Sequence, residues 1–439
     1  MNLTITDARR QRSMAMASPH APSKIPDSGR DDRFDEALAA EPRRRATRRV
    51  AFWLLVLVFA ATMLGTTLPT PLYDIYQAQW HFSAAMVTLI FAVYAAAVLA
   101  TLLLAGRSSD QTGRKPVLAA ALGVSALSTV AFIFAPNEGV LLVGRVLSGL
   151  SAGLMTGTAT ATLTELVPAS AGRRSSLAAT AANMGGLGLG PLIAGLFAQY
   201  APHPTTLVFE VYLAVLAAAG LCLLFVPETV SPRRRPTLRF AGLGIPERGR
   251  GQFIAAAVAA FAAFALLGLF SSLVPGFIGG VLHQDSHAVQ GAVVFGMFAV
   301  GTVTQVALSR FSSRRVVLAG LGLFLAALAL IVAALAQAGM ALFLAGTVVG
   351  GVAVGAIFLG SLATANRLAP PERRGHVVST FFVACYAGLI IPVVGVGVLS
   401  AFTGTFPAVL AFSLLLAALC LFSLARIATA LASGRPVSQ

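Results

Sequence analysis

The stretch Gly106-Arg-Ser-Ser-Asp110-Gln-Thr-Gly113-Arg114-Lys115 places four charged residues between two long apolar runs of the chain. Charged residues make up only 11% of the 439 residues, whereas 57% are hydrophobic and the mean hydropathy is +0.83. A soluble domain is roughly 45–50% apolar and about 25% charged. This chain has too few polar groups to cover its apolar surface in water. We therefore predict a membrane protein.

The apolar runs are long and continuous, and each approaches the roughly 20 residues that a spanning helix needs. Closed barrels, the other structures that cross a bilayer, require alternating patterns that these runs lack. We therefore predict an all-α membrane protein with twelve spanning helices. The predicted spans are 50–73, 84–105, 116–136, 139–164, 175–200, 207–226, 253–274, 288–309, 316–338, 340–362, 377–401 and 406–425.

The basic residues fall on one side of these spans. Thirty of the 31 Lys and Arg residues lie in the two terminal tails or in every second connection, and the opposite connections contain none. Basic residues that flank spans stay in the cytoplasm. We therefore predict that both termini are cytoplasmic. The net charge of +15 is then explained by the topology of the protein in the membrane, so we expect no nucleic-acid partner.

The second half of the sequence repeats features of the first half. Residues 113–119 resemble residues 313–319 at an offset of 200, and Gly149-x-x-x-Gly153 matches Gly351-x-x-x-Gly355 at an offset of 202. Thr66-Thr67-Leu likewise resembles Ser271-Ser272-Leu. Two parallel six-helix repeats are typical of secondary transporters, whose substrates bind near the bilayer midplane between the halves.

The repeat defines the predicted domains. We expect six-helix bundles at 49–226 and 253–426, joined by a cytoplasmic linker at 227–252 that is rich in Arg and Pro. The polar segment 1–48 has no apolar run, and we interpret it as a disordered cytoplasmic tail. Residues 427–439 form a second cytoplasmic tail.

With the twelve spans and the repeat, the opening stretch resembles the loop signature of the major facilitator superfamily, although Gln111 stands where the family usually has Arg. The resemblance covers about residues 50–426. It implies two pseudo-symmetric six-helix bundles and a secondary active transporter, not an enzyme. It also implies a cytoplasmic gate in which Arg114 pairs with Asp110 and Glu165 and in which Asp110 faces span 11 near His376. The gate residues would be Gly106, Asp110, Gly113, Arg114, Lys115 and Glu165. The alternative is a solvated loop that only sets the topology.

Arg145 is the one basic residue outside the cytoplasmic set, and a buried intramembrane arginine is costly and usually functional. It resembles the superfamily's span-4 arginine, which is associated with proton coupling. The alternative is an arginine that extends to the outer interface. Asp74 and Glu210 are the candidate proton carriers, since partial burial raises a carboxyl pKa towards the working range. The alternative is that both are solvated at the outer mouth.

Glycine and proline in span 5 resemble the superfamily's antiporter motif, with Ala194-Gly195 in place of a final Gly pair. The motif residues are Gly186, Gly190, Pro191 and Gly195. They predict a thin, kinked face on which the halves pack, although glycine packing is common in any span. The candidate pocket residues are Tyr94, Asn183, Gln305 and Tyr386, or these side chains serve only helix packing. So few polar groups favour a lipophilic or amphipathic cargo.

We therefore predict proton-coupled efflux of a small hydrophobic compound, such as a drug or metabolite, by a monomer in the lipid bilayer. A Lys-poor, Ala- and Arg-rich composition indicates the plasma (inner) membrane of a bacterium. A proton- or sodium-coupled importer is the alternative, and a membrane sensor or enzyme is disfavoured. We expect no cofactor and no metal, because Cys and His form no ligand spacing and no nucleotide-binding loop is present.

Overall fold

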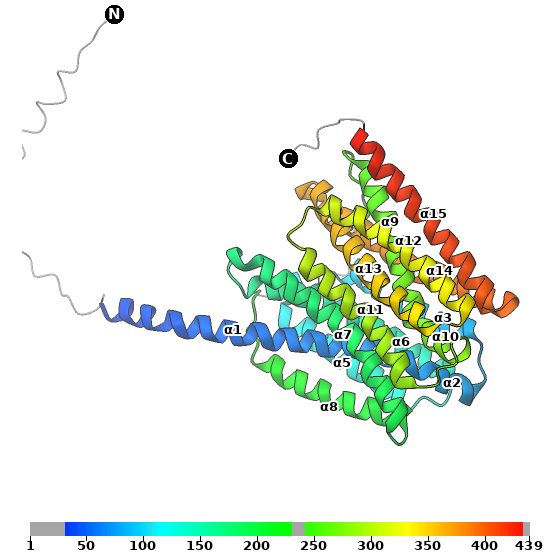
Figure 1. Cartoon of the computed structure of the whole chain (residues 1–439). Coiled ribbons are helices and arrows are strands. Elements are labelled where there is room, and N and C mark those ends of the chain that lie inside the picture. The colour runs from blue at the N-terminus through cyan, green and yellow to red at the C-terminus, as the bar shows by residue number, and fades with distance from the viewer. Residues whose placement is uncertain (1–30, 107, 231–241, 433–439) are drawn as a thin grey trace, which may run out of the picture. The chain divides into compact units, whose positions relative to one another are not determined.

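The structure is a computed structural model that describes residues 31–106, 108–230 and 242–432. Within these ranges all regular structure is helical, and twelve helices are long and apolar enough to cross a membrane (Figure 1). The predicted all-α fold with twelve spans is thus confirmed. The elements are α1 (Asp31–Thr67), η1 (Thr70–Leu72), α2 (Tyr73–Trp80), α3 (Ala84–Ala105), α4 (Ser108–Thr112), α5 (Arg114–Ile133), α6 (Glu138–Glu165), η2 (Ala169–Ala171), α7 (Gly172–Tyr200), α8 (Pro204–Leu224), α9 (Arg250–Ser272), α10 (Val274–Gly280), α11 (His287–Leu308), α12 (Ser313–Gln337), α13 (Met340–Leu368), η3 (Pro371–Arg373), α14 (Arg374–Thr403) and α15 (Thr405–Ala432).

The start of α1 differs from the expected tail. The helix begins at Asp31, inside the segment 1–48 that we interpreted as disordered. Acidic residues at its start and a run of Ala, Glu and Arg favour a helix there. Residues 1–30 lie outside the described part, as do 231–241 of the linker and 433–439 of the second tail. Arg48–Gln439 form one compact unit.

The first span of each half breaks near the same position. Pro69 and Pro71 lack the N–H groups that would bond to the carbonyls of Gly65 and Thr67 in a continuing helix. The chain therefore leaves α1 at Thr67 and continues through η1 into α2. In the second half α9 ends at Ser272 and α10 follows. The two breaks touch, because the Thr70 hydroxyl donates to the carbonyl oxygen of Ser271 at 3.2 Å.

Close helix packing also repeats between the halves. In α6, a Cβ on Gly149 would meet the backbone of α3 at Tyr94, and a Cβ on Gly153 would meet Thr101. In α13, a Cβ on Gly351 or Gly355 would likewise meet the backbone of α11. The fourth helix of each half thus packs on the second helix at glycine positions, as closely spaced small residues allow.

The two halves meet along α3 with α14 and α7 with α11, a pair that lies side by side in Figure 1. We call the end of the spans next to the Arg-rich connections the basic end. At the opposite end a Cβ on Gly397 of α14 would collide with Thr88 of α3, and Gln199 accepts the backbone N–H of His287 at 3.0 Å. The halves are therefore tightly closed at the opposite end.

Candidate functional site

Arg145 lies on α6, fully enclosed within the first half at 1% exposure. One Nη1 hydrogen bond of 2.5 Å goes to the carbonyl oxygen of Thr66, in the last turn of α1. The guanidinium also stacks 4.3 Å from the centroid of the Tyr94 ring. No carboxylate of a described residue lies within ion-pair distance. The negative end of the broken α1 helix and an aromatic face therefore stabilise this charge.

Further aromatic side chains surround this arginine. Tyr94 of α3 lies near Thr66 and near Tyr386 of α14, in the other half. Tyr73, in α2, interacts with both Arg145 and Tyr94. We call Thr66, Tyr73, Tyr94, Arg145 and Tyr386 the interface cluster. It lies where the broken first span and α3 approach the second half.

Two buried polar atoms of the interface cluster have no hydrogen-bond partner within the described ranges. They are the Tyr73 hydroxyl and the Arg145 Nε. Such orphaned groups are rare, because an unpaired buried donor costs free energy. A polar group of a bound molecule or a water would satisfy them.

Asp74 is half-buried at the closed end, where α2 faces the second half. Its Oδ1 is next to the backbone of Gly276 in α10, and the carboxylate interacts electrostatically with His287 at the start of α11. The acid is therefore placed between the halves. Glu210, by contrast, is exposed on α8. The structure does not bring these two carboxylates together.

The other two pocket candidates are separate from the interface cluster. Asn183 is half-buried in α7 and Gln305 is buried in α11. Where α7 and α11 pack, a Cβ on Gly188 would touch Phe298. Asn183 precedes Gly188 in α7 and Gln305 follows Phe298 in α11, so both lie nearer the basic end than this contact. Within the described residues, no hydrogen bond links Asn183 or Gln305 to Tyr94 or Tyr386.

The glycines of the span-5 motif are contact points on both sides of α7. A Cβ on Gly186 or Gly190 would collide with the α1 backbone at Ala60 or Leu64, and one on Gly195 would collide with His287 of α11. Pro191 lacks the N–H that would bond to Leu187, and the Thr67 hydroxyl donates to that carbonyl at 2.7 Å instead. Gly186 and Gly190 therefore pack on α1 of the same half, and Gly195 packs on α11 of the second half.

The opening stretch forms an ion-pair cluster at the basic end. Arg114, at the start of α5, pairs through Nη1 with Asp110 at 2.6 Å and through Nη2 with Glu165 at 2.7 Å. Ser109 accepts a further hydrogen bond from Nη1 at 2.6 Å. We call Asp110, Arg114 and Glu165 the basic-end cluster. The expected pairing within the gate motif is thus present.

Glu228, just beyond α8, completes this arrangement and was not singled out from the sequence. Its carboxylate accepts the backbone N–H groups of Arg114 at 2.8 Å and Lys115 at 3.0 Å. It therefore caps the positive N-terminus of α5. Burial alone would raise the pKa of Glu228, but these backbone donors, with those of Val230 and Thr229, hold it below its usual value. In the sequence, the only feature that could have indicated a role for Glu228 was an acidic residue shortly after a predicted span.

The structure does not bring Asp110 into the expected contact with span 11. Here the Asp110 side chain is 55% exposed, and the first residues of α14, Arg374 to His376, are exposed as well. The His376 ring lies next to Gly242, and its Cβ lies next to Gly244. Among described residues, Arg173 does reach Ser309 across the halves at 2.9 Å.

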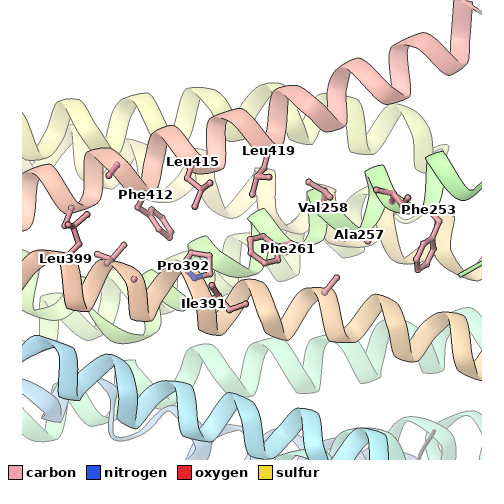
Figure 2. Close-up of a pocket in the computed structure, with 16 residues that line it drawn as sticks. Phe253, Ala257, Val258, Phe261, Ile391, Pro392, Leu399, Phe412, Leu415 and Leu419 are labelled. Carbon is pink, nitrogen blue, oxygen red and sulfur yellow. The ribbon is translucent and has the colours of Figure 1, made fainter. Parts of the chain in front are cut away.

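A larger cavity than the second pocket described below lies elsewhere and was not predicted. It has a volume of about 650 Å³ and is enclosed by α9, α14 and α15 of the second half alone (Figure 2). Its lining, which includes Phe261, Pro392 and Phe412, is entirely apolar. None of the four candidate pocket residues lines it. Ile391, one of the lining side chains, is exposed. The cavity therefore opens towards the surface that lipid would cover.

Twelve spans, a buried arginine between helices and an ionic cluster at one end define a multi-pass membrane transporter. The sequence model of the Major Facilitator Superfamily matches residues 55–392. The chain therefore belongs to that family and is a transporter, not an enzyme.

The matched relatives differ in what their names say. An uncharacterized MFS-type transporter, YceJ of Bacillus subtilis, is 27% identical over 378 residues, 83% of this chain and 93% of YceJ. Multidrug resistance protein MdtL of Shigella flexneri is 40% identical over 79 residues, 17% of this chain and 19% of MdtL. A uridine/deoxyuridine transporter of Lactococcus lactis is 33% identical over 96 residues, 22% of this chain and 20% of that protein. The last two matches span about a fifth of each relative.

A solved structure shares the fold over nearly its whole length. A bacterial homolog of the human lysosomal transporter Spinster, in an inward-facing and unoccupied conformation, superimposes with a TM-score of 0.68 at 17% identity. The match covers 89% of this chain and 99% of that chain. At this identity the likeness shows the fold alone.

Proposed function

We propose that this transporter exports a small hydrophobic or amphipathic compound in exchange for protons, by alternating access. In this proposal the basic end faces the cytoplasm of a bacterium, and the protein acts as a monomer in the plasma (inner) membrane. The observation that carries the proposal is the interface cluster. It holds a buried arginine, with no carboxylate partner among the described residues, against the Tyr94 ring, and Tyr94 lies near Tyr386 of the opposite half.

Binding in the interface cluster supports an aromatic or amphipathic cargo. Its side chains offer ring faces and, at Tyr73 and Arg145, two donors without partners among described residues. Sites that combine apolar walls with a few polar groups recognise drug-sized molecules. The short match to a multidrug resistance protein supports the same class of cargo. Because the cluster joins both halves, relative movement of the halves would change its contacts.

Asp74 is the better candidate of the two for the proton carrier. It lies between the halves at the closed end, beside His287, whereas Glu210 faces outward from α8. A carboxylate whose surroundings change when the halves move apart would change its proton affinity with them. Such a change couples proton binding to the conformational cycle.

The test uses everted membrane vesicles with an imposed pH gradient and a panel of fluorescent amphipathic dyes. We expect wild-type vesicles to accumulate a dye, and Asp74→Asn to abolish the dependence on the gradient. Glu210→Gln, a carboxylate-to-amide change outside the interface, is the matched control and should retain it. Gradient-driven uptake by Asp74→Asn at the wild-type rate would contradict the assignment of Asp74.

Import is the second candidate, and the match to a uridine/deoxyuridine transporter supports nucleosides as the cargo to test for it. The same vesicles distinguish the two directions. An exporter accumulates cargo in everted vesicles, whereas an importer accumulates it in right-side-out vesicles. Accumulation of nucleosides only in right-side-out vesicles would replace the export proposal.

A further inference from the structure

A small second pocket lies at the basic end of the second half. Its volume is about 150 Å³, roughly five times the share of one water in the liquid. Four helices of one half enclose it: α9, α12, α13 and α15. The lining residues are Gln252, Ala256, Arg314, Val317, Thr364, Arg367 and Ile427. Two arginines thus line one small pocket, and no carboxylate does.

These two arginines occupy the positions that correspond to the basic-end cluster of the first half. Arg314 is the second residue of α12, and Arg114 is the first residue of α5, at an offset of 200. Arg367 lies in the last turn of α13, and Glu165 is the last residue of α6, at an offset of 202. The repeat therefore keeps the first arginine but replaces its carboxylate partner by a second arginine. Asp110 is likewise replaced, by Arg310.

The second half supplies no carboxylate to this pocket. Arg114 is paired with two acids, whereas Arg314 donates from Nη2 to the backbone oxygen of Ile427 at 3.3 Å. Neither Arg314 nor Arg367 has an ion pair within residues 31–106, 108–230 and 242–432. The sequence contains no Asp or Glu after Glu372, so nothing corresponds to Glu228 either.

We propose that this pocket binds a phosphate group, which takes the place of the missing carboxylates. Arg314 is half-buried and Arg367 is exposed, and both line the same small pocket. The two like charges repel each other, whereas an anion between them is attracted to both. The guanidinium fork matches phosphate oxygens, and the Gln252 amide adds a neutral donor. The ligand is thus held by Arg314 and Arg367 together.

The position of the pocket limits where the phosphate comes from. Gln252, Arg314, Arg367 and Ile427 each lie within three residues of the end of a spanning helix. This is the depth at which lipid headgroups meet the protein. The phosphate of an anionic lipid and free phosphate from the aqueous phase both reach this level, and the experiment separates these two sources.

The experiment measures thermal unfolding of the purified full-length protein, which requires no knowledge of the cargo. In detergent, inorganic phosphate is titrated against chloride at matched ionic strength. In lipid nanodiscs, phosphatidylglycerol is compared with phosphatidylcholine. A ligand that binds the folded state raises the unfolding temperature. We expect wild type to gain stability in at least one arm, and the responding arm identifies the source.

Arg367→Glu is the decisive variant, because it recreates the Arg–Glu pair of the first half. We expect the Arg367→Glu protein to fold. Its apparent affinity for phosphate or anionic lipid should fall by about tenfold or more, because a charge-assisted contact is lost. Arg314→Gln should lose the response as well. Arg315→Gln, which removes an exposed charge outside the pocket, is the matched control and should respond like wild type.

Two results would overturn the proposal. One is a wild-type protein that responds neither to phosphate nor to anionic lipid. The other is a response that Arg367→Glu retains in full, or that Arg315→Gln loses to the same extent, because the effect would then follow net charge and not this pocket.

Discussion

At the residue scale, Arg145 explains how a charge survives inside the first half. An unpaired buried charge is strongly unfavourable. The Thr66 carbonyl and the Tyr94 ring offset part of that cost, since both carry partial negative charge towards the guanidinium. These contacts fit a structural role, in which Arg145 caps α1, and a functional role, in which it couples proton binding to transport. A substitution that removes the charge of Arg145 and keeps its side-chain volume separates the two roles.

We predict that Arg145→Met leaves the fold intact and abolishes transport. Replacing a buried charge by an apolar side chain of similar size is often neutral or stabilising. The unfolding temperature should therefore stay near that of wild type, while gradient-driven dye transport falls by about tenfold or more. Val146→Met, on the neighbouring and more exposed position, is the control. A stable Arg145→Met protein that transports normally would assign Arg145 to packing only.

At the element scale, α7 and α11 form the closest contact between the halves. A Cβ on Gly291 would collide with the backbone oxygen of Pro191, well inside ordinary van der Waals contact. Backbone atoms cannot move aside as a flexible side chain does. These two helices can therefore approach only because glycine faces glycine and proline here.

We predict that Gly291→Ala separates α7 from α11 and favours opening at the closed end. Transport should fall, and Ser271→Cys, buried at that end, should react faster with a polar thiol reagent. The assay requires replacement of the three native cysteines, all of which are free. Gly296→Ala in the same helix meets no atom within 4 Å and should leave both readouts unchanged. Equal behaviour of the two variants would argue against the helix contact as the cause.

At the scale of the whole molecule, the two ends of the transporter differ in this conformation. The end opposite the Arg-rich connections is closed by α3 with α14 and α7 with α11. At the basic end Asp110 is exposed and held by Arg114. If the halves alternate, Asp110 is available to meet the start of α14 when the basic end closes, where a helix N-terminus attracts an anion.

We predict that Asp110→Asn slows transport without destabilising the present conformation. A largely exposed ion pair contributes only about 0–1 kcal/mol, and Arg114 keeps Glu165. The unfolding temperature should therefore hardly change, while the transport rate falls because the other conformation loses a contact. Glu372→Gln, an exposed acid at the same end, serves as the control. Unchanged transport in Asp110→Asn would leave this stretch with a topological role alone.

Much of this architecture follows from local sequence properties. Twelve helices, their approximate bounds and the glycine-mediated face of α7 were predicted because hydropathy, charge placement and small residues act over neighbouring positions in the chain. The pairing of Arg114 with Glu165 came from a resemblance to a family motif. Glu228 was missed, because a carboxylate that caps a helix more than a hundred residues away leaves no local pattern.

The sequence by itself determined the class of protein, since a chain this apolar must place its helices in lipid and its arginines at one edge. Only the tertiary structure decided which polar groups meet. It placed Arg145 against Tyr94 and the end of α1, separated Asp74 from Glu210, and brought Arg314 and Arg367 to one pocket without a carboxylate. These outcomes depend on how helices far apart in the chain turn their faces towards each other. Hydropathy does not encode such rotations, because every face of these helices is similarly apolar.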